Sequence, residues 1–324
     1  MDPARRIGAH LPLAGGMVKA AERAHAIGAT ALQIFGDNPA AWRRRAEPPA
    51  ELPAFRDRLD AYDIRPLAVH AAYLINLAGP DEAFARRSIE VLGHELRAAA
   101  TFGARFLNVH AGSHRGTSLD DGIARVAAGI GRVVARDGNG AREPMIVLEN
   151  SGGGGFPVGA TLEDLERIAE AAARRDVPEQ RLGFCLDTAH LWAAGFRIDD
   201  PVVCDAVLDE FERRIGLRRL VLVHLNDSKA EAGTHLDRHE HVGAGAIGER
   251  GLGHIVRHPR LAGATFIVET PGMDEGYDEV NVARVHDLLA GRPLPPLPPG
   301  AFEVRGARSR ASGPAEAAPS SRRC

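Results

Sequence analysis

The chain has 324 residues, of which 44% are hydrophobic and 26% are charged. That composition supplies enough apolar side chains for a sizeable core and excludes wholesale disorder. No apolar run is long enough to cross a bilayer, so we expect no membrane anchor. The three cysteines have no C-x-x-C spacing, which argues against a disulfide framework and against a zinc site built from cysteine. We therefore expect a cytoplasmic protein in a reducing compartment.

The formal net charge of −3 is unevenly distributed along the chain. Residues 291–324 carry six Arg and two Glu, so that segment has a charge of +4 and residues 1–290 have a charge of −7. An acidic globular part does not attract a polyanion by itself. If the partner is anionic, bound metal cations would supply the missing positive charge.

Short β-branched apolar runs alternate with amphipathic stretches along most of the chain. The apolar runs predict eight strands: Ile7–His10, Ala31–Phe35, Leu67–His70, Phe106–His110, Met145–Glu149, Gly183–Asp187, Leu220–His224 and Thr265–Glu269. The amphipathic stretches predict helices that include Met17–Ile27, Ser88–Phe102, Leu162–Arg174 and Val203–Ile215. Gly28, Gly103 and Gly216 stand where the end of a helix favours a left-handed residue. Thr161-x-x-Asp164 has the spacing of a capping box.

Eight strand–helix units in about 290 residues favour a single α/β domain, a (β/α)8 or TIM barrel, over an open doubly wound sheet. An open sheet would carry a Gly-rich phosphate-binding turn directly after an early strand. Ser151–Phe156 is Gly-rich and follows a strand, but it lacks the G-x-G-x-x-G order and comes late in the chain. We assign the barrel to residues 1–290. Residues 291–324 are rich in Pro, Arg and Ala and poor in large apolar side chains, and we expect them to be disordered.

Residues of the types that bind metals stand at the ends of most predicted strands. Five strands end on His70, His110, Glu149, His224 and Glu269, and a sixth ends on Asp187, with His190 three residues later. Beyond the seventh strand, Asp237 and His239 are two residues apart, which puts both side chains on one side of an extended segment. The C-terminal ends of barrel strands converge on one face, where active sites form. A single such residue is more readily a structural hydrogen-bonding group or a helix cap, but six strand ends on one face indicate a shared metal centre.

Five histidines and four carboxylates are too many donors for a single tetrahedral zinc ion. Shared through bridging carboxylates, they suit two or three closely spaced divalent ions, and the lack of thiolates among them favours Zn²⁺ or Mn²⁺. A site with three such ions has an excess of positive charge, which suits an anionic substrate such as a phosphodiester. The sequence has no recognisable Ser-His-Asp or Cys-His nucleophile motif, so the expected nucleophile is metal-activated water.

Several longer motifs surround these residues. In chain order they are Ile7–His10 (IGAH), Tyr73–Leu77 (YLINL), Asn108–His114 (NVHAGSH), Leu148–Asn150 (LEN), Cys185–His190 (CLDTAH), His224–Lys229 (HLNDSK), Asp237–Gly248 (DRHEHVGAGAIG) and Val268–Thr270 (VET). In content and order these motifs resemble the endonuclease IV family, the type 2 apurinic/apyrimidinic endonucleases (deoxyribonuclease IV). The resemblance extends from Ile7 to about Glu275 and covers nearly the whole barrel.

The resemblance implies a TIM barrel of the xylose-isomerase-like superfamily with three zinc ions per chain, Mn²⁺ being possible at one site. It assigns the nine donors to three ions: His70, His110 and Glu149 to the first; Glu149, Asp187, His224 and Glu269 to the second; His190, Asp237 and His239 to the third. The implied reaction is hydrolysis of the phosphodiester 5′ to an abasic site in double-stranded DNA during base excision repair, which leaves a 3′-hydroxyl and a 5′-deoxyribose phosphate. Either Glu149 or Glu269 would accept the proton of the attacking water, and the sequence leaves that choice open.

Family members bend the duplex and extrude the abasic nucleotide with loops that follow the early strands. The positions predicted to bind DNA are Asn38, Trp42, Tyr73 and Arg238. Ala40 stands where many members carry Arg, so one contact to DNA is expected to be missing. Arg43–Arg45 would either compensate electrostatically or form a solvated helix end. The resemblance also implies a monomer that acts without a protein partner.

Two other functions are compatible with parts of this pattern. A metal-dependent sugar isomerase or epimerase of the same superfamily would share the barrel and its His and carboxylate ligands. It would use one or two ions and would not require His190, Asp237 and His239. A non-catalytic damaged-DNA binder, in which the metals only hold the fold, would be expected to have lost a ligand, and all nine are present. The sequence therefore favours the endonuclease.

Overall fold

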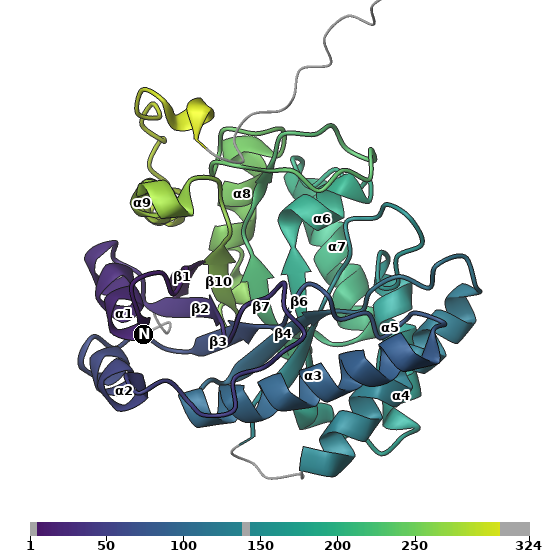
Figure 1. Ribbon diagram of the computed structural model, residues 1–324. Helices are drawn as coiled ribbons and strands as arrows, with labels where there is room; N and C mark the ends of the chain where they lie inside the picture. The colour runs from purple at the N-terminus through teal and green to yellow at the C-terminus, as the bar shows by residue number, and fades with distance from the viewer. Residues whose placement is uncertain (1–4, 138–142, 305–324) are drawn as a thin grey trace, which may run out of the picture.

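The computed structural model describes residues 5–137 and 143–304. Eight parallel strands form its centre: β1 Arg6–His10, β2 Ala31–Phe35, β3 Leu67–His70, β4 Phe106–His110, β5 Met145–Glu149, β6 Leu182–Asp187, β7 Leu220–His224 and β10 Thr265–Val268. They close into a barrel in the order β1-β10-β7-β6-β5-β4-β3-β2, and the helices surround it on the outside (Figure 1). The predicted (β/α)8 barrel is confirmed.

The helices are α1 Met17–Ala26, α2 Leu52–Ala61, α3 Glu82–Phe102, α4 Leu119–Asp137, α5 Leu162–Ala173, α6 Thr188–Ala193, α7 Pro201–Arg214, α8 Gly248–Arg257 and α9 Tyr277–Leu289. A small antiparallel pair, β8 Asp227–Ser228 and β9 His239–Glu240, lies in the long connection between β7 and α8. Over the described ranges, no helix is both long and apolar enough to traverse a membrane.

All eight predicted strands are present, and their ends differ from the prediction by one residue at most. The ends of the helices differ from their predicted positions by more residues than the ends of the strands do. Helix α3 begins at Glu82, six residues before the predicted start at Ser88. Asp81 caps it there by accepting a hydrogen bond from the backbone N–H of Phe84 at 2.8 Å. The first turns of this helix are mostly polar and therefore lack the apolar periodicity on which the prediction rests.

Local capping signals set several helix ends. Thr161 Oγ1 accepts a hydrogen bond from Asp164 N at 3.1 Å, and Asp164 Oδ2 accepts one from Thr161 N at 3.4 Å, so the predicted capping box opens α5. Gly103 follows α3 with a φ of 78°, and Gly28 and Gly216 also have positive φ. L side chains rarely adopt this conformation, which explains glycine at the three positions.

The inside of the barrel is built in layers. Strands β3 to β7 each contribute one side chain to an apolar cluster within it, namely Ala68, Phe106, Val147, Cys185 and Leu222. Because side chains alternate along a strand, the residue two positions further on points inward as well. On these strands that residue is polar in every case: His70, Asn108, Glu149, Asp187 and His224. A polar layer at the C-terminal end of the barrel thus lies directly above an apolar one.

The chain after α9 packs against the rest of the protein as far as Val304 and is yellow in Figure 1. His241 Nε2 lies 2.8 Å from the carbonyl oxygen of Ala301, and Ala301 and Val304 are buried. Composition predicts disorder from residue 291 onward. Residues 291–304 instead form a packed extension, because their few apolar side chains find partners on the barrel. Residues 305–324 lie outside the described residues.

Candidate metal centre

The nine predicted donors lie together at the C-terminal ends of the barrel strands. Their ligand atoms form three groups, each with all atoms within 4.8 Å of one another: His70, His110 and Glu149; Glu149, Asp187, His224 and Glu269; and Asp187, His190 and His239. Asp237 adjoins the third group, with carboxylate oxygens 3.3 Å from His190 Nε2 and 3.0 Å from His239 Nε2. Glu149 and Asp187 each belong to two groups and therefore link all three.

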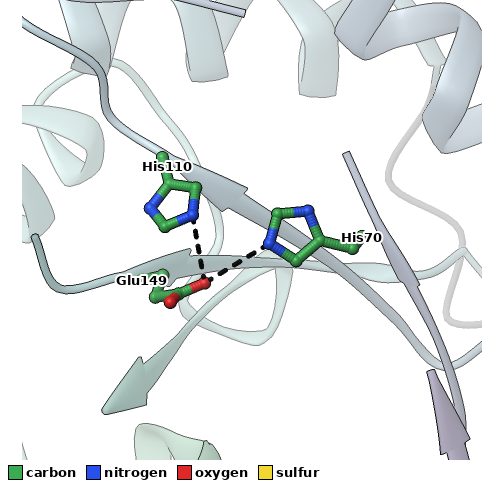
Figure 2. A group of neighbouring side chains, drawn as sticks. All are labelled: His70, His110 and Glu149. Carbon is green, nitrogen blue, oxygen red and sulfur yellow. Dashed lines mark ion pairs between the residues drawn. The ribbon is translucent and has the colours of Figure 1, made fainter. Parts of the chain in front are cut away.

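The first group, in Figure 2, joins the last residues of three neighbouring strands, β3, β4 and β5. The Nε2 atoms of His70 and His110 each lie 3.6 Å from Glu149 Oε2, so both rings point at the same carboxylate oxygen (Figure 2). Burial lowers the pKa of His110 to about 4. Its imidazole is therefore neutral at physiological pH, and neutral histidine is the form that binds a metal ion.

The second group surrounds Nδ1 of His224, whose side chain has no exposed surface. That nitrogen lies 3.2 Å from Glu269 Oε2, 3.3 Å from Glu149 Oε1 and 3.9 Å from Asp187 Oδ2. Burial opposes ionisation of Glu149, but the nearby imidazoles, His110 and His224 foremost, hold its pKa well below the usual value. Burial raises the pKa of Asp187. Carboxylates crowded around one imidazole nitrogen form an electronegative pocket that suits a cation.

Hydrogen bonds to the backbone set which ring nitrogen three of the histidines turn towards the centre. The Nδ1 atoms of His70, His190 and His239 lie 2.8, 2.9 and 2.7 Å from backbone carbonyl oxygens. A carbonyl oxygen only accepts hydrogen bonds, so in each ring Nδ1 carries a proton and Nε2 is the nitrogen that faces the centre. Histidines that bind metals are commonly held in this way.

In His224 the outer hydrogen bond is made by Nε2 instead of Nδ1, and its partner is Gln33, a fully buried side chain of β2. Gln33 Nε2 donates to Glu269 Oε1 at 2.7 Å, so Gln33 Oε1 is left to accept a hydrogen bond from His224 Nε2 at 3.1 Å. Nε2 of His224 therefore carries a proton, and Nδ1 is the nitrogen that faces the centre. His10, the last residue of β1, lies with Nδ1 3.2 Å from the same oxygen of Glu269.

Two buried asparagines hold the carboxylates of the centre. Asn108 Nδ2 donates to Glu149 Oε2 at 2.5 Å. Asn226 Nδ2 donates to Asp187 Oδ2 at 2.6 Å, while its Oδ1 accepts a hydrogen bond from the backbone N–H of Glu269 at 2.8 Å. Supporting hydrogen bonds of this kind orient the side chains that bind metals and raise metal affinity.

Three donor atoms of the centre are buried and make no hydrogen bond of good geometry, although each lies close to another donor atom: Glu149 Oε1, His224 Nδ1 and His239 Nε2. An unpaired polar atom in a protein interior costs about 1–3 kcal/mol. All three atoms belong to the donor groups, and a bound cation would supply the partner that each of them lacks. Histidine and carboxylate donors without thiolates match the preferences of Zn²⁺ and Mn²⁺. The residues present therefore fit a cluster of divalent ions.

Comparison with known proteins identifies relatives over nearly the whole barrel. The family described as "Xylose isomerase-like TIM barrel" matches residues 21–289. A probable endonuclease 4 from Methanoculleus marisnigri is 39% identical over 282 residues, which cover 87% of this chain and 98% of that protein. The crystal structure of endonuclease IV from Thermus thermophilus matches with a TM-score of 0.76 and 37% identity, over 88% of this chain and 99% of that chain. The chain belongs to the endonuclease IV family.

Sugar epimerases share the barrel as well. The 3-keto-D-glucoside 4-epimerase from E. coli matches with a TM-score of 0.59 over 88% of this chain and 99% of that chain, at 15% identity. A likeness at that level of identity shows the fold alone. The difference between the epimerases and the endonuclease IV family must therefore be sought in the site.

The loops after β2 and β3 carry three of the residues predicted to contact DNA. Tyr73 is 67% exposed, and its ring lies edge-on to that of Phe35, with the ring centroids 5.0 Å apart. Asn38 is exposed, and its Oδ1 accepts a hydrogen bond from Ala40 N at 3.0 Å, which shapes the loop. Both side chains lie at the end of the barrel that carries the metal centre.

Trp42, the third of these residues, packs against α3. Its ring meets Phe84 edge to face at 5.0 Å, and the guanidinium of Arg87 lies 4.5 Å from its centroid. This packing holds the loop after β2 against α3. Arg238 is exposed in the segment between Asp237 and His239, at the rim of the third donor group.

Some residues of the site were not predicted, although strand parity could have found them. His10, Gln33 and Asn108 have the same inward position near the end of a strand as the donors. His241 fits the spacing of a ligand as well as His239 does, but it faces away from the centre. Its Nδ1 accepts a hydrogen bond from Asn281 Nδ2 at 2.9 Å, and its other ring nitrogen lies against a backbone carbonyl.

Two hollows flank the barrel at opposite ends. One of about 490 Å³ is lined by Tyr73, His110 and Arg115 and lies beside the metal centre. Another of about 780 Å³ is lined by Arg6 and Arg105 at the N-terminal ends of the strands. Active sites of this fold form at the C-terminal ends, so we assign the substrate to the smaller hollow.

Proposed function

We propose that this chain is an apurinic/apyrimidinic endonuclease of base excision repair that hydrolyses the phosphodiester 5′ to abasic sites in double-stranded DNA. The expected products carry a 3′-hydroxyl and a 5′-deoxyribose phosphate. Its family makes the chain a metal-dependent DNA endonuclease, a hydrolase. The observation that carries the finer proposal is the third donor group, Asp187, His190 and His239, with Asp237 beside it; Asp187 links it to the first two groups, which share Glu149.

We assign up to three zinc ions to the centre, with Mn²⁺ fitting one position. The donors would be His70, His110 and Glu149 for the first ion, Glu149, Asp187, His224 and Glu269 for the second, and His190, Asp237 and His239 for the third. Bound there, divalent ions supply charge stabilisation for the phosphodiester oxygens and bring the pKa of water to about 7.

Of the two candidate proton acceptors, Glu269 is the better placed. Its side chain is 15% exposed, whereas that of Glu149 is 1% exposed, so Glu269 can pass a proton on to solvent. Gln33 and His10 hold its Oε1, which leaves Oε2 directed at the centre. Burial opposes ionisation, but His224 and His10 hold the pKa of Glu269 well below its usual value. The carboxylate is therefore ionised at physiological pH.

We assign recognition of the lesion to exposed side chains around the metal centre. Tyr73 and Asn38 would contact the distorted duplex, and Arg238 would pair with a flanking phosphate. Trp42 would act indirectly by supporting the loop that carries Asn38. The abasic nucleotide, which lacks a base to stack, is the cheapest one to extrude. We expect the protein to act as a monomer.

The strongest alternative is a sugar isomerase or epimerase of the same superfamily. Such enzymes need one or two ions, which the first and second donor groups would provide. They would have no use for the His190 and His239 imidazoles on either side of Asp237. A non-catalytic DNA binder would not need all nine donors to lie together at the ends of the strands. Both alternatives predict no incision of DNA.

The test uses a short duplex with one tetrahydrofuran abasic analogue and the purified, metal-loaded protein. The analogue cannot undergo β-elimination, so a 5′ cut that leaves a 3′-hydroxyl requires hydrolysis. We expect a strong chelator to abolish incision and His110→Ala and Glu269→Gln to lack it. His25→Ala, which changes an exposed histidine of α1, should cut like the wild type. An intact duplex after incubation with folded, metal-loaded protein would overturn the proposal.

A further inference from the structure

A separate cluster of metal-ligand side chains lies on the outer helices, away from the barrel interior. His254 lies in the last turn of α8 and His258 is the residue that follows the helix, and their rings meet edge to face with the centroids 5.4 Å apart. Asp205 belongs to α7, the neighbouring helix. Its Oδ1 lies 2.6 Å from His254 Nε2 and 3.3 Å from His258 Nε2.

We propose that Asp205, His254 and His258 bind one divalent transition-metal ion, of the class of Zn²⁺, Co²⁺ and Ni²⁺. Their three ligand atoms lie within 4.8 Å of one another, and none of them belongs to the reaction centre. Two imidazoles and one carboxylate form a donor set typical of these ions. Mg²⁺ and Ca²⁺ require mostly oxygen ligands and do not suit it.

The geometry needs little adjustment to accept such an ion. Tetrahedral zinc with bonds of about 2.0–2.2 Å separates its ligand atoms by roughly 3.3 Å. Asp205 Oδ1 and His258 Nε2 already have this separation, and the contact with His254, at 2.6 Å, has to open by about 0.7 Å. The side chain of Asp205 is 51% exposed, which leaves room for water to complete the coordination.

The metal-free arrangement limits the affinity of this outer site. His258 Nδ1 accepts a hydrogen bond from Arg260 N at 3.3 Å, so the ring proton is on Nε2 and faces Asp205. Binding a cation at Nε2 moves that proton to Nδ1 and gives up the long hydrogen bond. The guanidinium of Arg260 pairs with Asp209 at 2.5 Å, which reduces its repulsion of a bound ion. The outer site therefore binds more weakly than the enclosed centre.

A metal ion in this place would join two helices that are otherwise held by side-chain packing and ion pairs. Asp205 lies in the first half of α7, and both histidines lie at the end of α8. Anything that binds the folded chain but not the unfolded one raises the free energy of unfolding. Added metal should therefore raise the melting temperature even when the reaction centre is already full.

The test counts zinc on the loaded enzyme. Wild type, His254→Gln and Asp205→Asn are dialysed to equilibrium against the same free Zn²⁺, and zinc per chain is measured by mass spectrometry. We expect the wild type to hold one zinc more than either variant, and all three to incise abasic DNA at equal rates. His25→Gln is the matched control and should retain the additional zinc. Asp205 is exposed, so its variant is expected to fold.

The melting temperature tests zinc binding independently of the measured zinc content. Added zinc should raise the melting temperature of the wild type and of His25→Gln more than that of His254→Gln. Equal zinc content in wild type and both site variants, with equal shifts in melting temperature, would overturn the proposal. Because incision is measured separately, failure of this outer site and failure of the proposed endonuclease activity are distinguishable.

Discussion

Arg44 Nη1 lies 3.0 Å from Glu95 Oε1, and both side chains are almost fully buried, with 6% and 4% of their surface exposed. The pair joins two loops. Arg44 Nη1 also donates to the carbonyl oxygen of Asn38 at 3.1 Å, in the loop after β2. Glu95 Oε2 accepts a hydrogen bond from Ala72 N at 3.0 Å, next to Tyr73 in the loop after β3. One buried ion pair therefore sets the spacing of the two loops that we propose contact DNA.

Removal of Glu95 should affect stability and DNA binding but not the metals. At about pH 8, where Glu95 of the wild type is ionised, Glu95→Ala leaves the guanidinium of Arg44 buried without its carboxylate, which should lower the free energy of unfolding by about 3–5 kcal/mol. The KM for abasic duplex should rise because the loops lose their common support, while zinc per chain stays unchanged. Urea unfolding, incision kinetics and metal analysis measure the three quantities.

Glu90→Ala is the matched control for that substitution, because Glu90 is exposed on the same helix. Its free energy of unfolding should stay within about 0.5 kcal/mol of the wild type. If Glu95→Ala were as stable as Glu90→Ala, the ion pair would have no structural role. A loss of zinc in Glu95→Ala would mean that the pair acts on the centre and not on the loops.

The same carboxyl predicts a dependence of stability on pH. Burial raises the pKa of Glu95 from 4.5 to about 7, and the attraction of Arg44 offsets this only in part. Between those values the folded protein holds a proton that the unfolded chain releases. The stability contributed by this proton is complete below the unfolded pKa and is lost as the pH rises through about 7.

Glu95→Gln cannot titrate at this position, which isolates the effect. The free energy of unfolding of the wild type, minus that of Glu95→Gln, should be larger at about pH 5 than at about pH 8. Urea unfolding of both proteins at the two pH values measures it. A difference that does not change with pH would show that Glu95 ionises in the folded protein as it does in the unfolded chain.

Gln33 should act on the centre without touching substrate. Gln33→Ala removes the hydrogen bonds that orient Glu269 and fix the proton of His224. Removal of such partners typically lowers metal affinity or activity by about 10–100-fold. We expect zinc per chain and the incision rate to fall together, and excess zinc to restore part of the rate. Gln180→Ala, on the exposed surface, should leave both unchanged. Full zinc content with normal incision in Gln33→Ala would refute the role.

The donors that end strands were predictable because an apolar run followed by His or a carboxylate is visible in the sequence itself. Parallel pairing then brings neighbouring strand ends together without further information, as for His70, His110 and Glu149. The inward residue of each strand repeats every second position, so His10 and Gln33 were accessible to the same reasoning. The barrel and most donors of its centre could therefore be predicted from short stretches of sequence.

The rest depends on contacts between distant segments. Arg44 meets its buried partner Glu95 only because the loop after β2 folds back on α3. The sequence alone therefore could not decide whether Arg44 compensates electrostatically for a missing contact to DNA or belongs to a solvated helix end. Spacing also cannot decide between His239 and His241. Their roles follow from which ring meets Asn281 of α9, a contact that no local pattern predicts. Tertiary packing decides such cases.

The segment after α9 supports the loop of the third donor group from outside. His241 Nε2 lies 2.8 Å from the carbonyl oxygen of Ala301. Arg284 donates hydrogen bonds at 2.5 Å to the carbonyl oxygens of both Val242 and Pro295. The side chain of His241 and the backbone of Val242, two and three residues after His239, are therefore tied to α9 and to residues 291–304.

Deletion of residues 291–324 should for this reason weaken the third donor group. Without Ala301, the loop that carries Asp237 and His239 loses an anchor, and we expect up to one zinc fewer per chain, slower incision and a lower melting temperature. Deletion of residues 305–324 alone keeps all of these contacts and should change none of the three quantities. Metal analysis, incision of the abasic duplex and thermal unfolding of both truncated proteins decide the matter. If the longer deletion keeps its zinc and its rate, the packed extension does not support the centre, and the loop holds its ligands through β8 and β9 alone.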